Sequence, residues 1–155
     1  PSPRHLSRRG PRVHVTDIAK AALVDTLAAL PAATGSVGDA ARAADVDQVP
    51  ADVLAALGGL DILVNNAGIA GPTGGVETHD DAEVERTIQV NLTSHVYFLR
   101  RFVPLLKTSG RDPSIIAMSS VAGRLGYSYR TPYAATKWAV VGLVSRWRPS
   151  WGRTG

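Results

Sequence analysis

Hydrophobic positions along the chain follow two periods, one typical of strands and one typical of helices. Short apolar or β-branched runs that end in polar residues predict strands over 12–17, 41–46, 60–64 and 114–118. Apolar residues spaced three or four apart predict helices over 18–30, 50–57, 80–106 and 133–145. Strands that alternate with helices in this way predict an α/β fold, with a parallel sheet covered by helices on both faces.

The predicted strands end in residues that suit ligand binding. In a parallel sheet with helices on both faces, ligands bind beyond the carboxyl ends of the strands. Small, polar or acidic residues stand at or just after four of these ends: Asp17, Asp45, Val46, Asn66, Ala67, Gly68 and Ser120. We therefore expect them to line one crevice.

Tyr133 and Lys137 add candidate chemistry to this crevice. Their spacing of four residues places them on one face of the last predicted helix, about one turn apart. A fixed ammonium group beside a phenol favours the ionised form of the phenol. Such a pair suits proton exchange with an alcohol or a carbonyl group. Taken alone the spacing is common, and a solvated helix face is the alternative interpretation.

In this order, the motifs resemble those of classical short-chain dehydrogenases/reductases. The resemblance runs from about Val13 to Val144 and adds Asn91 to the residues named above. It implies a Rossmann-like, doubly wound parallel sheet. It also implies an enzyme that transfers hydride between NAD(P) and a small alcohol or ketone.

The resemblance assigns four catalytic roles. Tyr133 is the general acid and base at the substrate oxygen, and Lys137 supports it and binds the nicotinamide ribose. Ser120, preferred to Ser119 because of its thirteen-residue distance from Tyr133, polarises the substrate carbonyl. Asn91 holds a water through its backbone, unless it is a purely structural residue that bends the helix.

The cofactor roles implied by the resemblance fall on the strand ends. Asp17 accepts hydrogen bonds from both ribose hydroxyls of NAD and repels the 2′-phosphate of NADP, so NAD is the expected cofactor. A helix N-cap is the alternative role for Asp17. Asp45 and Val46 contact the adenine. The turn that passes close to the cofactor is formed by Asn66, Ala67 and Gly68, although structural turn residues are an alternative there.

Both ends of the sequence depart from the family pattern. No Gly-rich turn precedes Val13, and after Val144 the letters SRWRPSWGRTG do not continue an apolar helix. We expect an incomplete sheet that lacks its first strand and its last strands. In the strand order 3-2-1-4-5-6 the missing first strand lies in the middle, so the remaining strands lose their bridge. The expected domain map is a disordered basic tail (1–11), a partial NAD(P)-binding domain (12–145) and an aberrant tail (146–155).

Composition narrows the possible partners. The net charge is +4, but seven arginines lie in 1–12 and 146–155, and the rest of the chain holds ten basic and thirteen acidic residues. We therefore expect no nucleic-acid binding. No apolar run reaches the roughly 18 residues of a membrane span, which predicts no membrane association. The chain has no cysteine, and its four histidines share no ligand spacing, so we expect a cytoplasmic protein without a metal site.

Two functional hypotheses remain. The first is an NAD(P)-dependent oxidoreductase acting on a small alcohol or carbonyl substrate. The second is a truncated or defective homologue without activity, at most a subunit-association module. The predicted helices over 80–106 and 133–145 resemble those that pair subunits in this family, which predicts a homo-oligomer if the chain folds.

Overall fold

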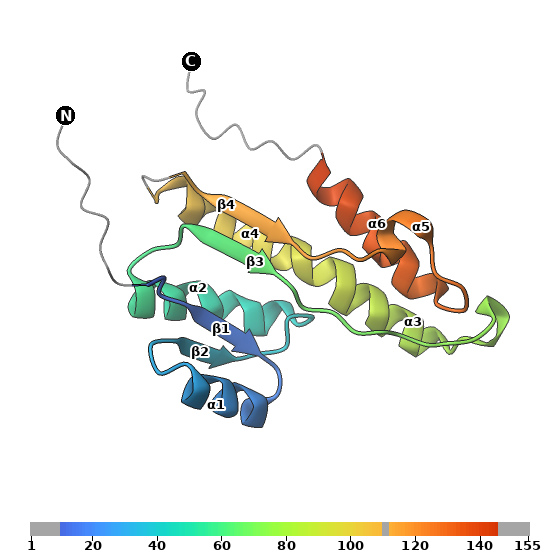
Figure 1. The fold of residues 1–155 in the computed structure, drawn as a ribbon, viewed down its shortest axis with the longest axis horizontal. Helices are drawn as coiled ribbons and strands as arrows, with labels where there is room; N and C mark the ends of the chain where they lie inside the picture. The colour runs from blue at the N-terminus through green and yellow to red at the C-terminus, as the bar shows by residue number, and fades with distance from the viewer. Residues whose placement is uncertain (1–9, 110–111, 146–155) are drawn as a thin grey trace, which may run out of the picture.

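A computed structural model describes residues 10–109 and 112–145. The predicted tail 146–155 and most of the tail 1–11 lie outside the described residues. The elements in chain order are β1 (His14–Asp17), α1 (Lys20–Ala29), β2 (Thr34–Val37), α2 (Ala43–Leu57), β3 (Ile62–Asn65), the 3₁₀ turn η1 (Val76–Thr78), α3 (Asp81–Ile88), the π-helical turn η2 (Gln89–Thr93), α4 (Ser94–Lys107), β4 (Ser114–Ala117), α5 (Ala122–Leu125) and α6 (Thr131–Ser145). The predicted α/β class is confirmed (Figure 1).

The described strands form two separate parallel pairs. β1 pairs with β2 from His14 opposite Thr34 onward, and β3 pairs with β4 from Ile62 opposite Ser114 onward. No ladder joins β1 to β3. The prediction that the strands lose their central bridge is therefore confirmed within the described part of the chain.

The second strand lies elsewhere than predicted. The prediction of a strand over 41–46 is wrong, because Ala43–Leu57 is a helix that buries Val46, Val49 and Val53. Alanine favours helices, and the valines recur at helical spacing. The actual strand β2 contains Gly35, where an added Cβ would lie 2.8 Å from Leu23 Cδ1. Glycine lets β2 pack closely on α1, and it also concealed the strand in the sequence.

The long helix predicted over 80–106 is present but interrupted. Asp80 begins it, since its side chain accepts hydrogen bonds from the backbone N–H groups of Ala82 and Glu83. The π-helical turn η2 then separates α3 from α4. Insertions of this kind widen a helix by one residue and occur often at functional sites.

Helix packing connects the two strand pairs. α2 packs on β1 and β2, while α4 packs on β3 and also on α2 (Figure 1). One buried cluster fills this junction: Val49, Val53, Leu63, Leu99, Phe102 and Leu106. The core therefore lies in the helix layer, and it joins the halves of the molecule without hydrogen bonds between their strands.

Two further searches covered the same described residues. They contain no helix that is both long and apolar enough to span a bilayer. They also contain no group of three or more His, Cys, Asp or Glu side chains placed to hold a metal ion.

The close contact between α5 and α6 provides one test of the fold. At Gly123 an added Cβ would lie 2.4 Å from Ser119 Oγ and 2.6 Å from the Lys137 carbonyl oxygen. We expect Gly123→Ala to lower the free energy of unfolding by about 1–3 kcal/mol, because overpacking forces the helices apart. Gly142→Ala is the matched control, since nothing lies within 4 Å of the added Cβ. It should stabilise α6 by up to about 1 kcal/mol. Equal effects of both changes in urea unfolding would contradict this packing.

His95 gives the fold a predictable dependence on pH. Its side chain is 1% exposed. Burial, and next the charge of Lys137, lower the pKa of His95 to about 4. The unfolded chain therefore takes up a proton near pH 6.5 that the folded chain refuses until about pH 4. Stability should fall by roughly 3 kcal/mol between these two pH values.

His95→Leu should flatten that part of the stability profile, as measured by urea unfolding at several pH values. His14, whose pKa burial also lowers, contributes equally in wild type and variant. Ser94→Ala changes a neighbouring buried residue without removing a titrating group, and it should keep the wild-type slope. If His95→Leu keeps that slope too, the buried imidazole is not its cause.

Candidate active site

Two cavities lie along the carboxyl ends of the strands. The larger, about 1230 Å³, lies between β1 and β3, and the smaller, about 610 Å³, lies between the end of β4 and α6. Asn66, Gly68 and Ile69 line both. The segment after β3 therefore connects the cavities into one continuous crevice.

The predicted catalytic side chains meet in the smaller cavity. Ser120, Tyr133 and Lys137 all line it, together with Asn66 and Gly68. β4 leads into Ser120, and the first turns of α6 present Tyr133 and Lys137 from the other side. The structure thus brings together three residues that lie up to 17 positions apart in the sequence.

Lys137 is held in one position. Its side chain is 5% exposed, and its Nζ donates a hydrogen bond to the Met118 carbonyl oxygen at 2.9 Å. The same Nζ lies 5.7 Å from the centroid of the Tyr133 ring. A Cβ on Gly68 would be 3.5 Å from Nζ, so the turn after β3 passes directly beside the amine. A buried ammonium group next to a phenol and an open cavity can act on a bound oxygen atom.

The two serines at the end of β4 play different parts. Ser119 Oγ donates to the Lys137 carbonyl oxygen at 2.7 Å and so fastens β4 to α6. Ser120 Oγ accepts a hydrogen bond from the Ala122 N–H at 3.2 Å. That bond leaves the Ser120 hydroxyl proton available for a group in the cavity.

Asn91 supports the crevice from within the π-helical turn. It is fully buried and lines neither cavity. Its Oδ1 accepts from the Ile69 N–H at 2.7 Å, and its Nδ2 donates to the Ile69 carbonyl oxygen at 2.9 Å. Nδ2 also contacts Thr136 Oγ1 at 3.3 Å. The side chain thereby holds the loop after β3 against α6, and only the backbone of Asn91 is left for a bound water.

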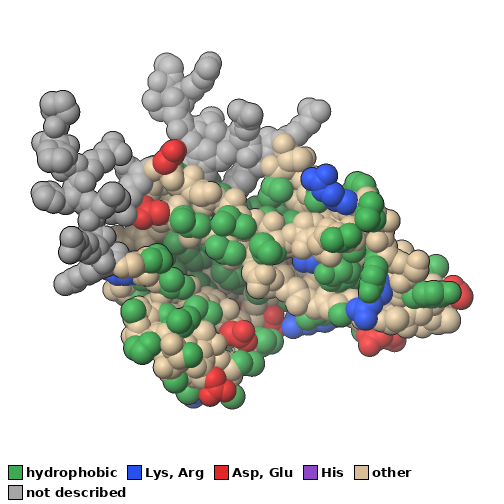
Figure 2. Space-filling view, in the orientation of Figure 1, with side chains coloured by type: hydrophobic (Ala, Val, Ile, Leu, Met, Phe, Trp, Pro, Cys, Tyr) green, Lys and Arg blue, Asp and Glu red, His purple; other side chains and the backbone are tan. Residues whose placement is uncertain are grey.

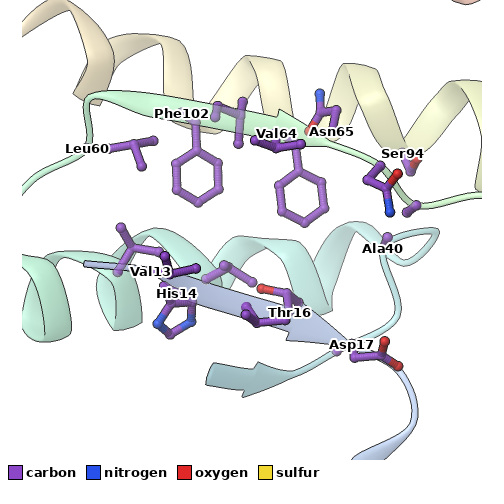
Figure 3. A pocket seen from close by; sticks show the side chains of 18 of the residues that line it. Val13, His14, Thr16, Asp17, Ala40, Leu60, Val64, Asn65, Ser94 and Phe102 are labelled. Atoms are coloured by element: carbon purple, nitrogen blue, oxygen red, sulfur yellow. The ribbon is translucent and has the colours of Figure 1, made fainter. Parts of the chain in front are cut away.

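The larger cavity has a polar end. Asp17 lines it and accepts a hydrogen bond from the Ala19 N–H through Oδ1 at 2.7 Å. The residue that begins α1 is Ala19, so Asp17 supports the turn before the helix without being its N-cap. In Figure 3, Asp17 and Ala40 lie toward the same ends of the strands as Asn65.

The placement of Asp45 and Val46 at a strand end is wrong. Both lie in the first turn of α2, and neither lines a cavity. Val46 is 1% exposed in the core. Asp45 Oδ2 accepts from the Asp39 N–H at 3.0 Å, so it braces the loop after β2.

Asp39 occupies the position expected of Asp45. It follows β2 and lines the larger cavity with Ala40. Arg86 of α3 pairs with its Oδ2 at 3.0 Å, and its Oδ1 accepts from the Ala41 N–H at 2.9 Å. The signal in the sequence was Ser36-Val37 before Gly38-Asp39, which an assignment of this stretch to a loop overlooked.

His95 is a second residue that sequence reasoning missed. It lines the larger cavity, and neither ring nitrogen has a hydrogen-bond partner within the described structure. An imidazole in mid-helix carries no sequence signal that distinguishes a cavity wall from a packed core.

Comparison with known proteins agrees with this geometry. Residues 3–155 match the short chain dehydrogenase family. The trans-4-hydroxycyclohexanecarboxylate dehydrogenase of Sinomonas cyclohexanicum is 48% identical over 87 residues, which are 56% of this chain and 32% of that protein. The 3-alpha-(or 20-beta)-hydroxysteroid dehydrogenase of Mycobacterium tuberculosis H37Rv is 40% identical over 121 residues, which are 73% of this chain and 46% of that protein.

Solved structures give the same result. A short chain dehydrogenase/reductase from Burkholderia phymatum in complex with NAD superposes with a TM-score of 0.81 at 28% identity. The match covers 85% of this chain and 48% of that one. The chain thus spans about half the length, or less, of these proteins. With its parallel strands and the family match over nearly all its residues, the chain belongs to the short-chain dehydrogenase/reductase family.

Proposed function

We propose that the crevice binds a nicotinamide dinucleotide, preferably NAD, and that the protein oxidises a small alcohol or reduces the corresponding ketone. The observation that carries the proposal is the meeting of Ser120, Tyr133 and Lys137 in one cavity. That cavity shares Asn66 and Gly68 with the larger one, whose far end holds Asp17 and Asp39. A long ligand with a polar group at each end fits this arrangement.

Tyr133 is the proton donor and acceptor in this proposal. In ketone reduction its hydroxyl gives a proton to the substrate oxygen, and in alcohol oxidation it takes that proton back. Ser120 donates its free hydroxyl proton to the same oxygen and so orients the substrate. The cofactor, when bound, supplies or accepts the hydride.

Lys137 positions Tyr133 and binds the cofactor. An ammonium group has three donors, and the Met118 carbonyl oxygen takes one of them. The other two are available for a ribose hydroxyl and for the water held at the backbone of Asn91. Because Asn91 fixes Ile69 beside Gly68, the amine and the turn stay in register.

The adenosine end falls to two carboxylates. Asp17 keeps Oδ2 for ribose hydroxyls while Oδ1 is bonded to the turn before α1. Asp39 and Ala40, rather than Asp45 and Val46, are the residues for adenine, because they line the cavity. Arg86 orients Asp39 from the side of α3.

The substrate class follows from the relatives. The two dehydrogenases reported above are named for a hydroxycyclohexane carboxylate and for hydroxysteroids, which are both alicyclic secondary alcohols. We include that class in the proposal. The smaller cavity, with Tyr127 and Arg130 at its margin, offers a ring-stacking surface and a cation for a carboxylate.

Replacing Tyr133 tests the catalytic role. Tyr133→Phe should lower turnover of cyclohexanol and 4-hydroxycyclohexanecarboxylate by at least a factor of about 100, since proton transfer contributes 10²–10⁴-fold. The thermal shift caused by millimolar NAD should remain, because binding to the folded state stabilises it whether or not chemistry follows. Tyr127→Phe, at the margin of the same cavity, is the control and should keep activity.

Retained turnover in Tyr133→Phe would remove Tyr133 from the mechanism. If NAD and NADP both fail to shift the melting temperature of the wild-type protein, the chain is instead a non-catalytic homologue.

Replacing Asp17 tests the cofactor preference. Asp17→Asn should weaken NAD binding by roughly tenfold, a change of about 1.4 kcal/mol, and should leave NADP binding equal or stronger. The ratio of the two dissociation constants is measured by calorimetry. Asp25→Asn, an exposed carboxylate of α1 outside both cavities, should leave this ratio unchanged. An unchanged ratio in Asp17→Asn would refute the ribose assignment.

A further inference from the structure

We propose that the groove between β1 and β3 binds one extended, apolar segment of another polypeptide as a parallel strand hydrogen-bonded to both. This interstrand groove is the body of the larger cavity, lined by 13–17 of β1 and 60–65 of β3. Each of these strands has a neighbour on its other side only. The proposal concerns a partner site and does not depend on the proposed reaction.

Backbone groups of both strands point into the groove. The carbonyl oxygens of Val13 and Asp17 accept hydrogen bonds from β2 and the residue after it. Because successive residues of a strand direct their N–H and C=O groups to opposite edges, those of His14 and Thr16 face β3.

The same reasoning applies across the groove. The carbonyl oxygens of Asp61 and Asn65 accept from Ser114 and Met118, on the β4 side. Ile62 and Val64 therefore turn their N–H and C=O groups toward β1. Figure 1 shows β1 and β3 running in the same direction, so one strand can lie parallel to both.

The walls of the groove select apolar side chains. Phe98 and Phe102 of α4 and Val49 and Val53 of α2 line it, and Figure 3 shows the Phe102 ring directed into the space between the strands. A strand there would place alternate side chains on these residues.

The opposite side of the sheet is apolar as well. Ile62 and Val64 are 56% and 53% exposed, and Ile116 of β4 is 45% exposed. Hydrophobic side chains gather around the hollow between the strand pairs in Figure 2. Both faces of the inserted segment would thus meet hydrocarbon, as in a buried parallel strand.

His95 supplies an independent observation. Its ring is 1% exposed, lines this cavity and has no partner for either nitrogen within the described residues. Buried polar groups are nearly always hydrogen-bonded, and an N–H or C=O group of an inserted backbone is a fitting partner.

The size and chemistry of the groove favour a single peptide strand over other occupants. At about 1230 Å³ the cavity exceeds the roughly 300–1000 Å³ of small-molecule pockets. Four-residue strands are about 13 Å long, which calls for an occupant of four to six residues. The chain's own residues 1–9 include three arginines and two prolines, which do not match an apolar wall with backbone donors and acceptors.

The test uses the peptide Lys-Thr-Val-Val-Ile-Val-Thr-Lys and amide hydrogen exchange of the whole chain followed by NMR. Saturating peptide should slow exchange at His14, Thr16, Ile62 and Val64 by at least tenfold. The amides of Val15 and Leu63 already face β2 and β4 and serve as internal controls.

A second peptide, Lys-Thr-Val-Pro-Ile-Pro-Thr-Lys, keeps the hydrocarbon but removes two backbone donors. It should bind at least tenfold more weakly. Equal binding of the two peptides, or protection that misses the four groove-facing amides, would overturn strand insertion. Protection of those amides that rises with protein concentration, without peptide, would assign the groove to a second copy instead.

Discussion

The packing of α2 on α4 is the contact on which the arrangement of this molecule depends. No hydrogen bond of the sheet joins β1 to β3, so the two strand pairs are related to each other only through the helices beneath them. The buried cluster around Phe102 and Leu106 carries most of this contact, because each large side chain contributes roughly 1.5–3 kcal/mol on burial. The ion pair between Arg101 and Asp47 crosses the same junction. Asp47 is 66% exposed, so that pair contributes less than about 1 kcal/mol. Hydrophobic packing therefore sets the distance across the crevice, and charge only adjusts it.

The two halves of the crevice are built with different firmness. On the side of α6, hydrogen bonds connect Ser119, Lys137 and Asn91 to strand ends and to the loop after β3, so the candidate catalytic groups sit in a continuous bonded frame. On the other side, Asp39 reaches the rest of the molecule through Arg86, and Asp17 is bonded only to its own turn. Any ligand that touches both sides would add a connection that the sheet itself does not provide.

Sequence reasoning succeeded where a residue's position follows from its own element. The strand before Asn66, the strand before Ser120 and the helix of Tyr133 and Lys137 have strong periodic patterns, and these residues meet in one cavity. It failed between Ala33 and Leu57. Gly35 disguised a strand whose closeness to α1 requires glycine, while an alanine-rich start of α2 resembled an apolar strand. The error displaced one carboxylate of the site from Asp39 to Asp45. The unpartnered ring of His95 depends on tertiary packing, and no local pattern predicts it.

The interstrand groove and the crevice are parts of one cavity, and this links the fold to the proposed chemistry. Asp17 ends β1 and Asn66 follows β3, so the separation of these strands also fixes the separation of the groups proposed to hold the two ends of a dinucleotide. A strand hydrogen-bonded to both β1 and β3 would set that separation to twice the usual spacing of about 4.8 Å, with no adjustment of the helix layer required. Helix packing tolerates small sliding movements, whereas a ladder of backbone hydrogen bonds fixes register residue by residue. It follows that the geometry of the cofactor end is governed by the middle of the sheet, while Lys137 and Tyr133 are held independently of it by α6.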